Sequence, residues 1–165
     1  MLDKLAIINR VIAEHQTIGQ HVKLLGDSVS DEEALKSLEG ARADWIPGRL
    51  EAVSEKQKRL QQTMNALDEG LRRHFAFEEK ALPPLLGELL MQSLILEHRE
   101  IKERIDEAKS IAADTKLEGL SRDELLSEEA HMQHIVANIG HLVEEHAARE
   151  EAVLAMMQRA LGEKD

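Results

Sequence analysis

Residues 60–82 read LQQTMNALDEGLRRHFAFEEKAL and decide the fold. Apolar side chains recur in this stretch at spacings of three and four residues, the period of one face of an α-helix. They are Leu60, Met64, Leu67 and Leu71. The same face continues into His74 and Glu78, and Pro83 should end the helix near Leu82. The segment therefore predicts an amphipathic helix whose core-facing stripe includes a histidine and a carboxylate.

Three further segments show the same helical period. The first runs from about residue 3 to 25, with Gly26 as its expected stop, and another runs from about residue 88 to 111. The last begins with a capping box at residues 121–124 and carries its stripe to Met157. Its predicted core-facing residues are Leu125, Met132, Ile135, Ile139, Leu142, His146, Glu150, Val153 and Met157. No sustained alternation of apolar and polar residues predicts a strand, so the expected class is all-α.

Four amphipathic helices with one apolar stripe each predict an antiparallel four-helix bundle. A second capping box at residues 30–33 predicts a short extra helix between helices one and two, ending at Gly40, followed by a turn at residues 45–48. A chain of 165 residues is close to the usual size of one domain. We therefore predict a single domain over residues 1–165.

The composition excludes several classes of function. With 21 Lys and Arg against 32 Asp and Glu, the net charge of −11 disfavours nucleic acid or an anionic membrane as partner. The absence of cysteine excludes thiolate catalysis and Cys-ligated metals. The longest run without Asp, Glu, Lys or Arg is residues 130–143, shorter than the ~20 residues that a membrane helix needs. We expect a cytoplasmic protein with no nucleic-acid or membrane partner; the sequence leaves open whether it has a protein partner.

Histidines and glutamates interrupt the apolar stripes in a doubled pattern. A His-x-x-x-Glu pair occurs at His74 and Glu78 and again at His146 and Glu150, and residues four apart share one helix face. The other two long helices carry one core-facing histidine each, in the related sequences EHQTI and EHREI. Two such hairpins would bring together four imidazoles and two carboxylates in a dinuclear metal site. The predicted ligands are His15, His74, Glu78, His98, His146 and Glu150.

This donor set narrows the choice of metal. Imidazole and carboxylate without thiolate suit iron, manganese, zinc, nickel or copper, whereas calcium and magnesium prefer oxygen ligands. The two carboxylates supply a charge of −2, which a metal pair with a bridging oxo or hydroxo group would balance. We expect two iron ions, with manganese or zinc as alternatives.

Other histidines and glutamates lie near these positions without sharing their faces. His21, His131, His134 and His141 should lie away from the site, since helical rotation or axial distance separates them from the ligands. Glu79, Glu145 and Glu151 are adjacent to predicted ligands but off the core face, so we expect them to be solvated. A hydrogen bond from one of them to an imidazole is the alternative.

The ordered motif resembles the hemerythrin-like, or HHE cation-binding, domains. Their pattern of His, His-x-x-x-Glu, His and His-x-x-x-Glu is met over about residues 3–160. Even Phe75 and Pro83 are similar to the family's segment after the first pair. The resemblance implies a non-haem di-iron centre bridged by Glu78 and Glu150. One iron would take His15 and His74, and the other would take His98 and His146.

The sequence departs from the oxygen-carrying hemerythrins in two respects. Leu94 and Lys102 flank His98 where those proteins have a second histidine, and the last pair is His-x-x-x-Glu instead of His-x-x-x-x-Asp. Reversible oxygen storage is therefore disfavoured. We expect a di-iron protein that presents an open metal position to oxygen, nitric oxide or peroxide, in sensing, stress response or iron handling. Expected pocket walls are Ile18, Leu71, Phe75, Ile101, Leu142 and Val153.

Two alternatives to this function stay open. The first is a metal-dependent oxidoreductase that consumes peroxide or nitric oxide, because the sequence does not distinguish binding from turnover. The second is a metal-free helical interaction bundle.

Overall fold

The computed structural model describes residues 3–29, 50–114 and 120–162, and all of its regular structure is helical. The long helices are α1 (Lys4–Val29), α3 (Leu50–Ala81), α5 (Glu88–Asp114) and α6 (Arg122–Gly162), and α4 (Pro83–Leu86) is a single turn. The prediction of an all-α chain with four long helices is therefore confirmed. The short helix and turn predicted over residues 30–48 lie outside the described residues.

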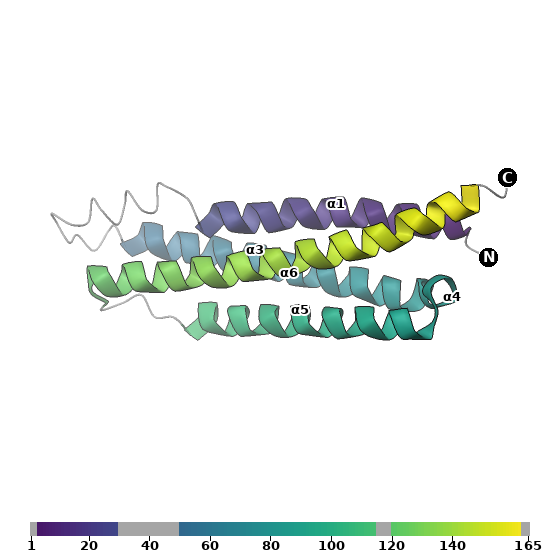
Figure 1. Cartoon of the computed structure of the whole chain (residues 1–165). Helices are drawn as coiled ribbons and strands as arrows, with labels where there is room; N and C mark the ends of the chain where they lie inside the picture. Colours follow the sequence, from purple (N-terminus) through teal and green to yellow (C-terminus); the bar gives the residue numbers. More distant parts are fainter. Residues whose placement is uncertain (1–2, 30–49, 115–119, 163–165) are drawn as a thin grey trace.

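The four long helices form an antiparallel bundle (Figure 1). Helix α1 packs on α3 and α6, and α5 packs on the same two helices. Consecutive helices run in opposite directions, so the described ends of α1 and α6 nearest the chain termini lie at one end of the bundle, together with α4 (Figure 1). Each long helix thus has two neighbours, and its buried face is shared between them.

Helix boundaries follow the predicted signals in part. Helix α3 ends at Ala81, just before Pro83, as predicted. Ser121 caps α6: its Oγ accepts a hydrogen bond from the Glu124 N–H, and Glu124 Oε2 accepts one from the Ser121 N–H. The stop predicted at Gly26 is wrong, because α1 continues to Val29. One glycine inside a helix costs only about 1 kcal/mol, which packing along the rest of α1 offsets.

The short helix α4 was not predicted from the sequence. Proline is favoured in the first turn of a helix, where the backbone has no hydrogen bond to lose, and Pro83 and Pro84 occupy that place. Gly87 then has φ +78°, the only positive φ among the described residues. This left-handed conformation suits glycine and lets the chain turn directly into α5.

The apolar core consists of two clusters. The larger lies toward the C-terminal end of α1 and includes Leu67, Leu71, Ile105 and Ile139. The smaller lies near α4 and is formed by Ile7, Ile8, Val11, Leu82, Met91, Leu94 and Leu154. Along each long helix, buried polar residues separate the two clusters. The bundle core is thus apolar, then polar, then apolar.

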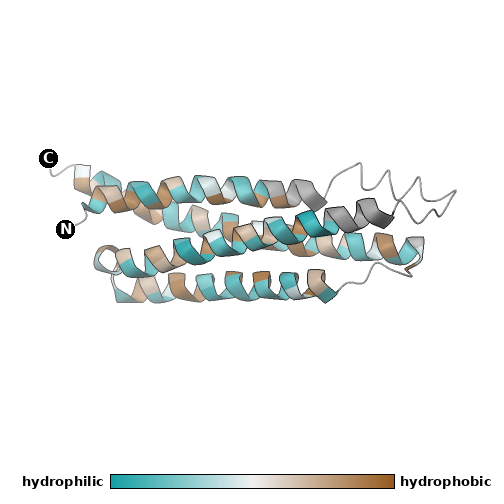
Figure 2. Ribbon diagram, turned by 180° about the vertical axis from the view of Figure 1, so that it is seen from behind, coloured by the Kyte–Doolittle hydropathy of each residue, from teal (hydrophilic) through white to brown (hydrophobic). Residues whose placement is uncertain are grey.

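The amphipathic pattern of each helix is visible on the ribbon, where hydrophobic and hydrophilic residues share every long helix (Figure 2). In α6 the buried face is centred on Val136, Val143 and Leu154, whereas the predicted stripe members Ile135, Leu142, Val153 and Met157 are half-buried. This difference arises because α6 packs on both α1 and α5, which places its buried face between two contact lines. None of the helices in the described part of the chain is long and apolar enough to cross a membrane.

Two leucines on α5 test this packing. Leu94 is 6% exposed in the smaller cluster, and Leu96, two residues later, is 61% exposed. We expect Leu94→Ala to lower the free energy of unfolding by about 2–5 kcal/mol, because it leaves a cavity in the core. Leu96→Ala should change it by less than about 0.5 kcal/mol. Urea denaturation measures both, and equal effects would contradict the placement of α5.

Candidate metal centre

A layer of buried polar side chains lies between the two apolar clusters. All six residues predicted as ligands are in it, each at most 8% exposed, and all four long helices contribute. They are His15, His74, Glu78, His98, His146 and Glu150. Their potential ligand atoms form two groups in which every atom lies within 4.8 Å of the others, and both groups contain Glu78 and Glu150. The structure thus brings together the whole predicted set.

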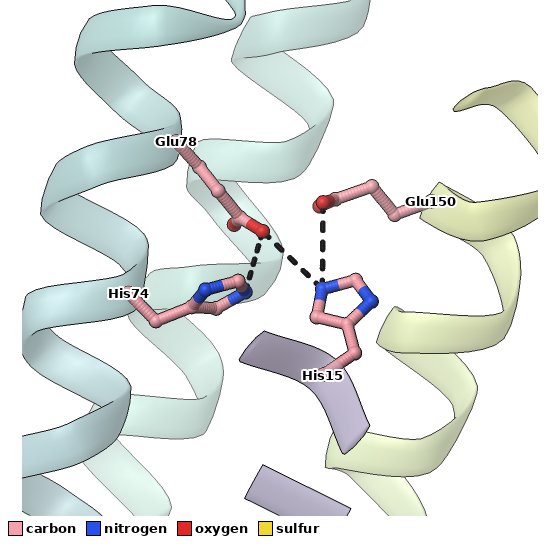
Figure 3. Close-up of side chains that lie close together, drawn as sticks. All are labelled: His15, His74, Glu78 and Glu150. Carbon is pink, nitrogen blue, oxygen red and sulfur yellow. Dashed lines mark hydrogen bonds and ion pairs between the residues drawn. The ribbon is translucent and has the colours of Figure 1, made fainter. Parts of the chain in front are cut away.

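The first group joins His15 and His74 to the two shared carboxylates (Figure 3). Glu78 from α3 and Glu150 from α6 point toward each other, with both imidazoles beside them (Figure 3). Nε2 of His74 is 2.5 Å from Glu78 Oε1. Nε2 of His15 is 3.3 Å from the same oxygen and 3.5 Å from Glu150 Oε1. Four N and O donors therefore converge on one point.

The second group joins His98 and His146 to the other oxygens of the same carboxylates. Nε2 of His98 is 3.0 Å from Glu78 Oε2, and Nε2 of His146 is 3.3 Å from Glu150 Oε2. The ring of Phe75 stacks on His98 with the ring centroids 4.0 Å apart. Because each carboxylate offers one oxygen to each group, Glu78 and Glu150 are placed to bridge two cations.

The buried charges shift the pKa values of the centre. Burial opposes protonation of His74 and His146, but hydrogen bonds and attraction from the nearby glutamates outweigh it and raise the pKa of both imidazoles. Burial also opposes ionisation of Glu78, yet the imidazoles of His15, His74 and His98 beside its carboxylate hold its pKa far below the usual value. Burial and the neighbouring Glu78 raise the pKa of Glu150. Without a cation, the centre thus holds protons in place of positive metal charge.

An outer carboxylate holds the Nδ1 atom of each imidazole. The pairs are Glu151 with His15 at 3.1 Å, Glu14 with His74 at 2.7 Å, Glu79 with His98 at 2.9 Å, and Glu97 with His146 at 2.5 Å. Since a carboxylate accepts, each Nδ1 carries the proton, and the neutral imidazole directs its Nε2 lone pair to the centre. These bonds fix the orientation that metal binding requires.

The positions of two outer carboxylates differ from the prediction, and the roles of the other two were not predicted. Glu79 and Glu151 were expected to be solvated, but they bond His98 and His15, because neighbouring helices cover positions that are off the core face of their own helix. Glu145 is exposed and pairs with His141, in agreement with the prediction. The roles of Glu14 and Glu97 were not predicted, although the repeated Glu-His dipeptide was their signal.

The centre contains buried polar atoms that a cation would satisfy. Nε2 of His74, His98 and His146, one oxygen of Glu78 and both oxygens of Glu150 are buried without a hydrogen-bond partner of acceptable geometry. Leaving such groups unpaired costs about 1–3 kcal/mol each, and more when they are charged. Metal ions bound by these nitrogens and oxygens would remove that cost and balance the two carboxylates. The residues therefore fit a dinuclear metal site.

Within the described part of the chain, pockets on opposite sides of α1 reach the predicted ligands. The first, the α1–α6 pocket, has a volume of about 280 Å³ and reaches His15, His74 and His146. Three predicted wall residues, Ile18, Leu71 and Phe75, line it. The other three, Ile101, Leu142 and Val153, do not line this pocket; for Leu142 and Val153 the reason is the rotated buried face of α6. The second opening, the α1–α3 groove, has a volume of about 290 Å³ and reaches Glu14 and His74.

The remaining histidines lie outside both ligand groups. Nδ1 of His21 donates to the Thr17 carbonyl, His141 pairs with Glu145, and His131 and His134 are exposed. Within the described residues, no potential metal-binding group includes any of them. Their predicted exclusion from the site agrees with the structure.

Comparison with known proteins gives one match. The family model of the hemerythrin HHE cation-binding domain matches residues 6–158. Neither the search of curated proteins nor the search of solved structures found a matching protein.

The raised pKa values of His74 and His146 predict a pH dependence for the metal-free protein. A raised pKa in the folded state adds stability that is complete below the unfolded pKa of about 6.5 and is lost as pH rises through the folded value. We expect the free energy of unfolding, measured with urea and a chelator, to fall as the pH rises above about 6.5. The double variant His74→Gln/His146→Gln should show a flatter profile. A native stability that rises with pH above this value would contradict the assignment.

Proposed function

Because the chain belongs to the hemerythrin HHE cation-binding domain family, we propose that its buried centre holds two iron ions and offers an open metal position to oxygen, nitric oxide or peroxide. His15 and His74 bind one iron, His98 and His146 bind the other, and Glu78 and Glu150 bridge them. The role we propose is sensing, stress response or iron handling. Manganese or zinc would fit the same donors and is the alternative occupant.

The division of the ligand atoms carries this proposal. Each of the two groups contains two imidazole nitrogens and an oxygen from each shared carboxylate. An isolated structural histidine usually donates to a backbone carbonyl, as His21 donates to the Thr17 carbonyl. Such a histidine does not account for two groups of imidazoles and carboxylates with the same composition. The unpartnered Nε2 and carboxylate atoms are also buried at the positions where two cations would need them.

The protein residues give a bound metal pair its orientation and surroundings. Iron, when bound, supplies a redox-active Lewis acid. The outer carboxylates hold the imidazoles in one tautomer and one orientation, and the two apolar clusters exclude water from either end. A bundle that already holds its ligands in place binds metal without a large rearrangement.

The α1–α6 pocket supports a small ligand. Ile18, Val22, Leu71, Phe75 and Val143 give its walls an apolar character, and it reaches three of the four imidazoles. A volume of about 280 Å³ admits diatomic molecules and peroxide and lies below the range of pockets for drug-sized ligands. The same pocket would also admit the substrate of an oxidoreductase. Only a measurement of repeated consumption of peroxide or nitric oxide therefore distinguishes that alternative from a binding protein.

Metal analysis after anaerobic purification tests the centre. We expect about two metal ions per native chain and the loss of at least one in His74→Ala, because that change removes a ligand of one group. His141→Ala, at an exposed histidine outside both groups, should retain the native content. Fewer than one metal per native chain, or an unchanged content in His74→Ala, would overturn the proposal and favour the metal-free bundle.

Adding nitric oxide, oxygen or peroxide to the iron-loaded protein distinguishes a binding protein from an enzyme. We expect the absorbance of the iron-loaded protein to change with nitric oxide or oxygen and to return when the gas is removed. Stoichiometric, reversible change supports binding. Repeated consumption of peroxide or nitric oxide by a small amount of protein would instead establish the oxidoreductase function. His74→Ala is the control for a signal that depends on the centre.

A further inference from the structure

The two openings beside α1 differ in charge. Glu144 and Glu151 lie in the wall of the α1–α6 pocket, and no Lys or Arg is among the described residues that line it. The α1–α3 groove is lined instead by Arg10 and Arg73 with a single carboxylate, Glu14, so its charged lining residues are positive in sum. Carboxylates at a mouth raise the local concentration of cations, and guanidinium groups lower it. The α1–α6 pocket therefore favours the passage of a metal cation.

His15 is the least enclosed of the four imidazoles. It is 8% exposed, against 3% for His74 and His146 and 0% for His98. Its Nε2 atom lies 3.3 Å from Glu78 Oε1 and 3.5 Å from Glu150 Oε1, and the second distance is the longest imidazole contact to the centre. The ring also forms part of the wall of the α1–α6 pocket. Of the predicted ligands, His15 is therefore the imidazole nearest to solvent.

The outer bond to His15 is correspondingly weak. Glu151 accepts from Nδ1 at 3.1 Å, the longest of the four outer bonds, and its side chain is 42% exposed. Glu14 and Glu97 are each held by an arginine, Arg10 and Arg149. Among the described residues no arginine pairs with Glu151 or with Glu79, but the Glu79 bond to His98 is shorter, at 2.9 Å, and the Glu79 side chain is less exposed, at 33%. Of the four bonds between an outer carboxylate and an imidazole, the Glu151–His15 bond is therefore the longest and the most exposed.

The two halves of the bundle explain why one side is open. The counterpart of the α1–α6 interface is the interface between α5 and α3, since His15 corresponds to His98 and His146 to His74. One residue after His146 stands Ala147, whereas one residue after His74 stands Phe75, which stacks on His98. Four residues after His15 stands Gly19, whereas four residues after His98 stands Lys102. Small residues thus occupy two positions in the wall of the α1–α6 pocket, and the equivalent positions of the α3–α5 interface carry Phe75 and Lys102.

We propose that divalent metal ions enter and leave the centre through the α1–α6 pocket, with His15 as the movable ligand and Glu151 as its latch. This inference rests on the proposed metal-binding function. A volume of about 280 Å³ holds a partly hydrated ion, because one water takes about 30 Å³. Rotation of His15 away from Glu78 and Glu150 opens the first ligand group, while His98 stays fixed between Phe75 and Glu79.

Two glycines test the route. Gly19 lines the α1–α6 pocket and Gly70 lines the α1–α3 groove, and at each a new Cβ would meet no atom within 4 Å. Leucine is a better helix former than glycine, so both variants should fold. We expect Gly19→Leu to slow anaerobic Fe²⁺ uptake and chelator-driven release together, about tenfold each, with an unchanged metal content. Gly70→Leu should leave both rates near native values. Slowing by Gly70→Leu instead, or by neither variant, would overturn the route.

Two glutamates test the latch. Glu151→Gln weakens the outer bond beside the α1–α6 pocket, and Glu79→Gln makes the same change at the equivalent α3–α5 interface. Outer hydrogen bonds to metal ligands typically affect affinity by about 10–100-fold. We expect Glu151→Gln to speed Fe²⁺ release to a chelator by about tenfold or more, and Glu79→Gln to speed it much less. Equal rates, or faster release from Glu79→Gln, would overturn the role of His15.

These outcomes are distinguishable from failure of the proposed function. If the native chain takes up no Fe²⁺, the metal-binding function itself fails. If the native chain binds about two ions and the rates ignore Gly19→Leu and Glu151→Gln, only the entry route and its latch fail.

Discussion

The need to bury four imidazoles and two carboxylates in an apolar bundle governs the rest of the structure. Each imidazole is held by an outer carboxylate from a neighbouring helix. The bonds run from carboxylate to imidazole in the order α1 to α3, α3 to α5, α5 to α6 and α6 to α1. This closed ring joins every pair of neighbouring helices at the same height. A slip of one helix along its axis would break two bonds and displace its ligands. The polar layer therefore sets the register that apolar packing alone leaves free.

The fold and the central residues could be predicted from the sequence because both depend on position within a single helix. The stripe that passes through Leu67 and Leu71 to His74 and Glu78 shows that polar groups face the core, whatever the partner helix is. The repetition at His146 and Glu150 shows that the groups belong together. All six residues are buried in the structure and converge from four helices.

What the sequence did not reveal depends on relations between helices. Glu79 and Glu151 lie off the core face of their own helix, and their bonds exist only because α5 and α1 pass beside them. The rotation of α6 that moves Leu142 and Val153 to half-buried positions depends in the same way on two neighbours. Whether proline residues begin helix α4, and whether α1 continues past Gly26, depends on packing as well as on the local preferences of proline and glycine. None of these is set by the spacing of residues along one helix.

Ala147 and Phe75 occupy equivalent positions in the two halves of the bundle but differ greatly in size. Two identical hairpins associating as separate chains would present the same wall on both sides of the centre, so any change that opened one side would open the other. Joining the halves in a single polypeptide releases that restriction. One half keeps a bulky ring against its histidine while the other carries a small residue at the equivalent place. Covalent linkage thus lets two ligand groups with the same donor set acquire different surroundings.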